Sequence, residues 1–408
     1  MHVIQYFIRR MLQRRHFWRY ATFSEVAELY ASRMLRLFAV RLASTFTSIF
    51  LYQEGFSLTF IALYFAALYG VKLLLTPLCA LLIARHGPKH ATLISNFVSA
   101  AAMLVLPFVT DPVYGTLALG GWLILQAHSI ALNNLAYLVD FSKVKHVAHA
   151  GKEIGYMNIV EKIAAGVSPL LGGTIAFLFG AESIMFIAAI FFLLSAGPLF
   201  LTAEPIRLQH GLNFKQFPWG VVWRSMRADF GVGFDIFATA TAWSLFLVVV
   251  VFSSGTDKVY AEIGFVTSVT LFVALASSYM FGKLIDHRRG RELLRFAGSA
   301  NGVVHALRIF VTTPFGVVLL NAINEATTAG YAMPFMRGMF DNADITKRRI
   351  EYLTVMEMVA NLGAVVAALL LAGLFALYEG EFALKAFFLM ASVAVLLIIT
   401  PRFALYQK

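Results

Sequence analysis

The chain has 408 residues, of which 60% are hydrophobic and 13% charged, and its formal net charge is +11. That composition excludes an ordinary soluble globular domain and is typical of a membrane protein. The basic excess does not predict nucleic-acid binding, because Lys and Arg fall in alternate loops between long apolar segments, a distribution that reports membrane topology.

Residues 1–31 are predicted to form a basic amphipathic extension. Arginines are interspersed there with Ile, Phe and Trp, and the segment lacks the apolar region of a cleavable signal peptide. Such a stretch is expected to lie on the anionic cytoplasmic leaflet of a membrane.

Twelve membrane-spanning helices follow, in an all-α membrane protein built from two pseudo-symmetric six-helix bundles. Each apolar run is long enough to cross a hydrocarbon core of ~30 Å. The first bundle (32–201) has predicted spans at 32–52, 57–84, 89–109, 114–139, 154–179 and 182–201. The second (230–400) has predicted spans at 230–252, 260–285, 291–312, 314–338, 351–378 and 381–400. A central cytoplasmic loop at 202–229 and a cytoplasmic tail at 401–408 complete the organisation.

Loop charges predict the orientation. One set of alternate loops is rich in basic residues, whereas Lys258 is the only basic residue in the intervening loops. By the positive-inside rule, both termini are then cytoplasmic and the spans are even in number. We expect a multi-pass protein of the plasma membrane, in a bacterium the inner membrane.

Two pairs of segments suggest an internal duplication. Ala80–Lys89 resembles Gly282–Arg291, since each has a small residue, apolar residues and then a basic cluster around a glycine. Gly155–Glu161 and Glu351–Glu357 also place Tyr and Glu at the same spacing. Two copies of one helical unit are the commonest architecture of secondary transporters.

The loops after spans 2 and 8 resemble a motif of the major facilitator superfamily. The second copy keeps Gly282, Asp286, Arg288 and Gly290. The first copy departs from the motif, with Ala80 and Ala84 in place of Gly and Asp, and keeps Arg85, Gly87 and Lys89. The resemblance covers nearly the whole chain after the first thirty residues, and it implies that Asp286 caps a helix and pairs with a basic neighbour, latching one conformation.

Span 5 is similar to the glycine-rich motif of proton-coupled drug antiporters in that superfamily. The matching positions are Gly155, Ala164, Ser168, Pro169, Gly172 and Gly173. The resemblance implies export. The same small residues also fit an ordinary close helix–helix contact, with Pro169 bending the helix.

Polar residues near mid-span are candidates for a substrate site. Ionisable groups at bilayer depth are costly and usually face a cavity or a partner. The resembled fold lines its central cavity with spans 1, 4, 7 and 10. The candidate substrate-binding residues are Arg41, Lys72, Gln126, His128, Asn133, Asn321 and Asn324. Their cationic members favour an anionic or zwitterionic solute, although His128 could instead satisfy a local hydrogen bond.

Four carboxylates are candidates for proton coupling: Glu325, Asp235, Glu357 and Glu161. Glu325 is preferred because it is placed near the middle of a cavity-lining span, where burial and a neighbouring cation would link its protonation to transport. The alternative is a permanent ion pair with Arg41 or Lys72. Glu161, Lys162 and Glu357 could form a cytoplasmic gate between the halves, and Asp235 could mirror Arg41.

The function predicted is secondary active transport of a small organic solute by alternating access, most simply as proton-coupled export by a monomer. Uptake by proton symport, a membrane receptor and a membrane enzyme are the alternatives. The sequence has no phosphate-binding loop of the ATPase type, so direct drive by ATP is not expected, and no cofactor is expected. His146 and His149 lack further ligands at metal-binding spacing, so no metal site is expected.

Overall fold

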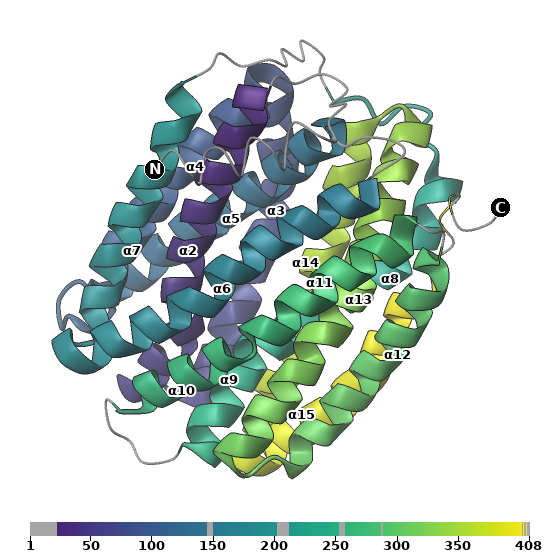
Figure 1. Cartoon of the computed structure of the whole chain (residues 1–408). Coiled ribbons are helices and arrows are strands. Elements are labelled where there is room, and N and C mark those ends of the chain that lie inside the picture. Colours follow the sequence, from purple (N-terminus) through teal and green to yellow (C-terminus); the bar gives the residue numbers. More distant parts are fainter. Residues whose placement is uncertain are drawn as a thin grey trace, which may run out of the picture.

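The computed structural model describes residues 23–144, 150–201, 212–252, 258–286 and 289–401, together with 403 and 405. Within these residues, twelve helical segments stand side by side, and no strand is present. Figure 1 shows α2, α4 and α7 on one side of the bundle and α8, α12 and α13 on the other, with α6 crossing between them. The predicted all-α fold with two six-helix bundles is confirmed.

The first half has six segments. They are α2 (Phe23–Gln53), α3 (Leu58–His86), α4 (Pro88–Val105) with its 3-10 extension Leu106–Thr110, α5 (Gly115–Val144), α6 (Ala150–Phe179) and α7 (Ala181–Ala196) with the 3-10 turn Gly197–Phe200.

The second half repeats this order. Its first segment joins α8 (Trp219–Phe237), a π turn (Ala238–Ala242), α9 (Trp243–Phe246) and a second π turn (Leu247–Val251). The others are α10 (Lys258–Val269) with α11 (Leu271–Asp286), α12 (Gly290–Leu307) with the 3-10 turn Arg308–Phe310, α13 (Pro314–Thr346), α14 (Arg349–Leu377) and α15 (Gly380–Ala394) with the 3-10 turn Val395–Ile399.

Several helices are longer than the predicted spans. Helix α2 begins at Phe23 rather than 32, and α8 begins at Trp219 within the segment predicted as a loop. Hydropathy marks only the part of a helix that crosses hydrocarbon, and the added turns carry charged residues that break the apolar pattern. Residues 1–22 of the extension, the first part of the predicted loop (202–211) and most of the tail lie outside the described residues.

Helix ends follow ordinary capping chemistry. Ser57 accepts a hydrogen bond from the backbone N–H of Phe60 at the start of α3, and Thr313 does the same for Gly316 at the start of α13. Gly87 joins α3 to α4 with a φ of 88°, a backbone conformation that favours glycine.

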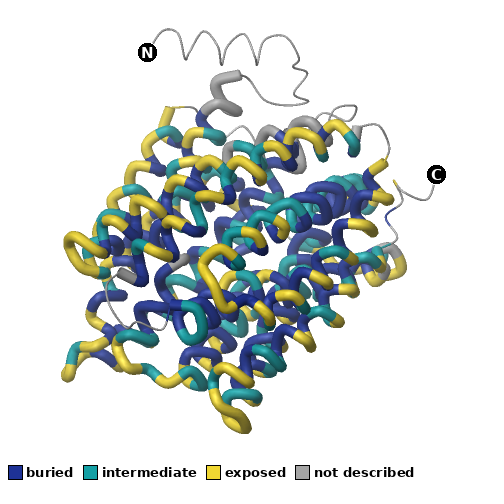
Figure 2. Tube along the Cα trace, turned by 60° about the horizontal axis from the view of Figure 1, so that its bottom comes forward, coloured by how far each residue is buried: buried dark blue, intermediate teal, exposed yellow. Residues whose placement is uncertain are grey.

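The outer surface is apolar and the interior holds both apolar and polar side chains. Figure 2 shows exposed positions mainly on the outer sides of the helices and buried ones inside the bundle. Large apolar side chains such as Leu74, Phe272 and Phe296 are more than seven-tenths exposed, as expected where lipid replaces water. Ten of the segments in the described chain are long and apolar enough to span a membrane.

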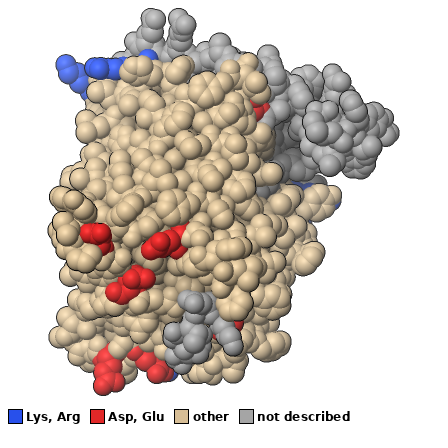
Figure 3. Space-filling view, turned by 90° about the vertical axis from the view of Figure 1, so that its left-hand side faces the viewer, with Lys and Arg blue, Asp and Glu red and all other residues tan. Residues whose placement is uncertain are grey.

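The charges on the outside are separated along the bundle. In Figure 3 the most prominent Lys and Arg side chains lie near the end where α2 begins, and most visible Asp and Glu lie in the other half of the view. We call the end that holds the beginning of α2 and the end of α15 the terminal face, and the other end the opposite face.

The two halves meet along two lines of contact, where α3 packs against α14 and α6 packs against α10 and α11. The second line is unusually close. A Cβ atom on Gly173 of α6 would lie 2.3 Å from the carbonyl oxygen of Tyr260, and one on Gly264 of α10 would lie 2.3 Å from that of Pro169. Small residues on both helices therefore let the backbones of the two halves touch.

Candidate functional site

A buried polar network in the second half is centred on Asp235 of α8. Its Oδ1 accepts a hydrogen bond from Asn301 at 2.9 Å and lies 2.6 Å from Nε2 of His305, both on α12. Its Oδ2 accepts the hydroxyl of Tyr331 on α13. All four side chains are buried, so the hydrogen bonds offset the cost of placing a carboxylate in the apolar interior.

Arg308 supplies the balancing charge of this network. Its guanidinium donates to Asn324 at 3.0 Å and to Thr239 at 3.3 Å, and one nitrogen lies 3.0 Å from Nδ1 of His305. It also lies over the ring of Trp243, 4.9 Å from the centroid. One buried anion and one buried cation thus share a set of neutral partners, and the network as a whole is close to neutral.

The first half holds a related arrangement around Arg36 of α2. Its guanidinium donates to Asn96 of α4 at 2.6 Å and to Ser129 of α5 at 3.2 Å. Helices α2, α4 and α5 correspond in chain order to α8, α12 and α13. Each half therefore buries a charged residue of its first helix against its third and fourth helices, with opposite signs in the two halves.

An ion pair joins the halves near the middle of the bundle. Lys162 of α6 donates to Glu325 of α13, and Arg41 of α2 lines the same small pocket of about 40 Å³. The partner expected for Glu325 was Arg41 or Lys72. The partner found is Lys162, because α6 crosses α13 at this depth, whereas Lys72 lies over the ring of Tyr69.

A second polar contact between the halves runs from Asn134 of α5, whose side chain donates to Glu357 of α14 at 3.3 Å. Glu161 accepts from Arg33 of its own half at 2.9 Å in this structure, so its part in a gate between the halves stays a prediction. Lys162 and Glu357 do bridge the halves.

A cavity of about 310 Å³ lies between the halves, on the terminal-face side of the bundle. The residues that line it from the first half include Arg33, Asn134 and Tyr137. Those from the second half include Asp229, Tyr331, Phe335, Met336, Met339, Met356 and Glu357. Toward the terminal face, the buried rings of Phe141 and Phe340 touch across the halves, with centroids 5.8 Å apart. Toward the opposite face, Phe46 and Tyr260 do the same at 5.5 Å.

The predicted site residues are only partly brought together. Asp235 and Asn324 belong to the Asp235 network, and Asn321 accepts from the indole of Trp243 beside it at 2.9 Å. Glu357 lines the cavity. Gln126, His128 and Asn133 lie on α5, where Asn133 is buried, His128 is half-buried, and Oε1 of Gln126 is buried without a hydrogen bond among the described residues.

The motif residues lie at helix ends and helix contacts. Lys89 pairs with Glu28 of α2 at 3.2 Å, Arg85 is exposed in the last turn of α3, and Gly290 begins α12. A Cβ on Gly155 would lie 3.5 Å from Cα of Gly282, so these two motif glycines meet across the halves. Arg288 and the side chain of Asp286 lie outside the described residues, so the latch stays a prediction.

The remaining motif positions all lie on α6. The hydroxyl of Ser168 donates to the carbonyl of Ala164 at 2.5 Å, one turn before the internal proline Pro169. A Cβ on Gly172 would lie 2.8 Å from the ring of Phe46, so this glycine lets α6 approach α2 in its own half.

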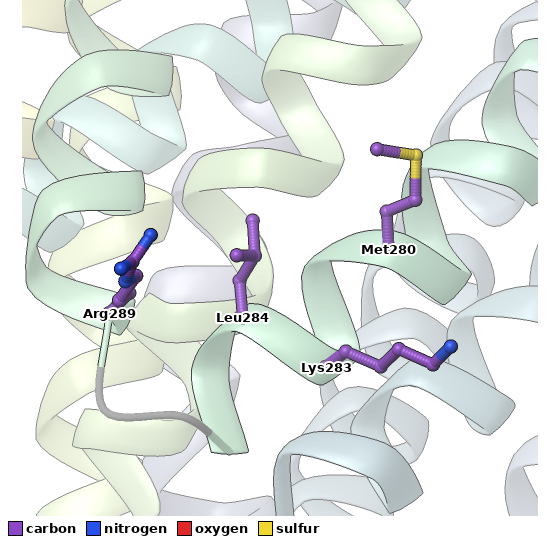
Figure 4. Close-up of a pocket in the computed structure, with 4 residues that line it drawn as sticks. All are labelled: Met280, Lys283, Leu284 and Arg289. Carbon is purple, nitrogen blue, oxygen red and sulfur yellow. The ribbon is translucent and has the colours of Figure 1, made fainter.

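A further pocket lies at the end of α11 and is lined by Met280, Lys283, Leu284 and Arg289. Figure 4 shows Met280 and Leu284 projecting to the same side of α11 while Lys283 extends away from them. None of these four residues lines the cavity between the halves, so this pocket is separate from the site described above.

Sequence reasoning missed the core of the Asp235 network. Asn301, His305 and Arg308 follow one another at spacings of four and three residues, which places them on one helix face. This row of polar residues on one helix face was the sequence signal from which the network could have been predicted. Helices α12 and α13, which carry most of the network, are also the two segments of the described chain that fall short of the apolar criterion for a membrane span.

Two halves of apolar helices, with buried charges and a cavity between them, define the class of multi-pass membrane transporters. Within that class the chain belongs to the Major Facilitator Superfamily, whose sequence model matches residues 29–259. The expected family is thereby confirmed. No curated protein gives a significant match to the chain.

Solved structures share the fold at low identity. A bacterial homologue of the iron transporter ferroportin, in an outward-facing state with soaked iron, is 13% identical with a TM-score of 0.66, over 93% of this chain and 98% of that one. The E. coli fucose:proton symporter FucP is 12% identical with a TM-score of 0.64, over 92% and 98%. The human organic anion transporter MFSD10 (TETRAN) is 12% identical with a TM-score of 0.65, over 93% and 99%.

Proposed function

We propose that the protein is a proton-coupled secondary transporter that moves a small organic solute by alternating access, with Glu325 as the coupling carboxylate. The observation that carries this proposal is the Lys162–Glu325 ion pair between the halves. Alternating access moves the halves relative to each other around a central site. A contact between α6 and α13 therefore forms in one state and separates in another.

Separation of Lys162 from Glu325 makes proton binding by the carboxylate more favourable. While Lys162 is near, the opposite charge favours ionised Glu325, and once Lys162 withdraws, an enclosed carboxylate favours its neutral form. Arg41 lies in the same pocket and would compete for Glu325. Protonation and the movement of the halves are thus linked.

Export is the proposed direction. It rests on the similarity of α6 to the glycine-rich antiporter motif, whose small residues here form the close contact with α10. Proton-coupled uptake is the alternative, and reconstituted protein distinguishes the two by the sign of the gradient that drives accumulation. The proposed location is a bacterial inner membrane with cytoplasmic termini, in keeping with the charge separation along the bundle.

The positions of Arg41 and Lys72 bear on the charge of the solute. An anionic or zwitterionic solute was expected from Arg41 and Lys72. Arg41 lies beside Glu325 in the small pocket, and Lys72 lies over Tyr69. Neither of these two cations lines the cavity of about 310 Å³ between the halves, whereas Glu357 does.

The coupling role is tested with purified protein in liposomes, a proton gradient of either sign, and ethidium and carboxyfluorescein as probes of opposite charge. The gradient should drive movement of a transported probe by the unmodified protein. Glu325→Gln should still exchange that probe without a gradient but should not respond to the gradient. Glu262→Gln, at an exposed carboxylate of α10, is the matched control. Full gradient-driven transport by Glu325→Gln would remove Glu325 from the coupling role.

A further inference from the structure

The cavity between the halves contains a buried carboxylate without a partner. Asp229 of α8 lines the cavity and is only 5% exposed. Among the described residues it forms no hydrogen bond and no ion pair. Glu357 lines the same cavity from α14 and accepts one hydrogen bond, from Asn134. An ionised Asp229 without a partner would be costly, so its carboxylate form needs a positive charge supplied from outside the chain.

The cations near the cavity are already engaged. Arg33 also lines the cavity, but it pairs with Glu161 at 2.9 Å and lies over the ring of Tyr137, 3.8 Å from the centroid. Lys72 lies over Tyr69 and attracts Glu357 from a distance. Even if Lys72 balances Glu357 completely, an ionised Asp229 has no counterpart among the described residues. The cavity therefore has room for one positive charge.

The rest of the lining suits an organic body. Phe335, Met336, Met339 and Met356 contribute apolar and polarisable surface, and Tyr137 contributes an aromatic ring. Aromatic and methionine side chains bind organic cations and adapt to irregular shapes. A metal ion would need more ligands of another kind, and the described residues contain no group of three His, Cys, Asp or Glu that could hold one. The cavity volume of about 310 Å³ lies at the lower end of the range for small-molecule sites.

We propose that this cavity binds an organic monocation with an apolar body, placed so that its charge lies near Asp229 and Glu357. The inference rests on the transporter function proposed above and names the substrate class of that function. Asp229 supplies the charge, Glu357 and Asn134 the polar edge, and the Met and Phe side chains the apolar wall. The Asp235 network adjoins this site through Tyr331, which lines the cavity as well.

Two ions of the same shape and opposite charge test the proposal: tetraphenylphosphonium and tetraphenylborate. Binding is measured by equilibrium dialysis against the full-length protein in detergent, with protein-free micelles subtracted. The unmodified protein should bind the phosphonium at least roughly tenfold more tightly than the borate, since the carboxylates favour one sign of charge. Asp229→Asn and Glu357→Gln should each weaken phosphonium binding by roughly tenfold or more. Glu262→Gln should leave it unchanged.

Equal binding of the two ions, or tighter binding of the borate, would overturn the proposal without the use of any variant. Phosphonium binding that both cavity variants retain would also overturn it. Transport is scored separately. Carboxylate-dependent phosphonium binding without gradient-driven movement would keep the site and reject the transport function. Gradient-driven movement of carboxyfluorescein without phosphonium binding would keep the transport function and reject the cation site.

Discussion

The hydroxyl of Tyr331 donates to Asp235 while the same side chain lines the cavity between the halves. The residue therefore touches both the buried network of the second half and the space where a solute would lie. A solute that displaces the ring of Tyr331 must also disturb its hydrogen bond to Asp235. The cavity and the network thus have a direct physical connection.

Tyr331→Phe tests that connection, because it keeps the ring and removes the donor. We expect a stability loss of about 1.5–3 kcal/mol, since the bond is made to a charged acceptor, and a larger fall in transport rate than in solute affinity. Thermal unfolding, binding and liposome transport measure the three quantities. Tyr378→Phe, at an exposed ring at the end of α14, is the control. Equal effects of the two substitutions would show that the hydrogen bond from Tyr331 to Asp235 does not link the cavity to the network.

The Lys162–Glu325 pair predicts rescue by charge reversal. Lys162→Glu alone places two carboxylates at the contact between α6 and α13, and Glu325→Lys alone places two ammonium groups there. Each should disfavour the state in which the halves touch and slow transport. The double exchange restores opposite charges and should recover part of the activity in liposomes. A double variant no better than the worse single one would argue against a direct pairing.

The Asp235 network predicts a non-additive effect on stability. Asp235→Asn leaves Arg308 buried without its balancing charge and should cost about 3–5 kcal/mol. Adding Arg308→Gln removes the uncompensated charge, so the double variant should lose less than the sum of the single changes. Chemical unfolding in detergent of the four proteins of this cycle measures the coupling. Strict additivity would show that the two charges do not interact.

Two glycines predict different outcomes for the same substitution. Gly173→Ala places a Cβ against the carbonyl of Tyr260 in the other half, whereas Gly233→Ala places one 1.7 Å from the carbonyl of Ala360 in the same half. We expect the first to shift the balance toward states in which α6 and α10 separate, with folding retained. The second should lower the yield of folded protein. Cysteine accessibility on both membrane faces and size-exclusion profiles separate these outcomes.

The orientation is tested by single-cysteine labelling in intact cells. Cysteines introduced at Lys215 and Lys347 should be protected from an impermeant reagent, whereas one at Lys258 should react. Lys347 has a positive φ of 54° at the turn between α13 and α14 and is exposed, so a lack of reaction there reflects the side of the membrane rather than burial. Reaction at Lys347 would invert the proposed topology.

The fold could be predicted from sequence more fully than the site. Apolar runs and the repeated loop motif were sufficient for the two bundles because both depend on local composition. The Asp235 network depends on which helix faces meet, and the π turn at Ala238–Ala242 breaks the periodicity from which faces are deduced. His305 and Arg308 were left out for another reason: their stripe on one face of a helix does not show which helix that face meets. The Lys162–Glu325 pair was missed because it joins helices from different halves, and no spacing within one helix encodes that crossing.

The π turn after Asp235 also bears on how this helix tolerates changes in length. The backbone N–H of Trp243 bonds to the carbonyl of Ala238, five residues earlier, so the turn contains one residue more than an α-helical turn. Loss of a residue from Ala238–Ala242 would leave an ordinary helix of sound hydrogen bonding, yet everything beyond it would turn by about 100°. The side chain of Trp243 would then lose its contacts with Arg308 and Asn321. A deletion that looks conservative in an alignment would therefore produce a well-folded helix that presents the wrong face to its neighbours.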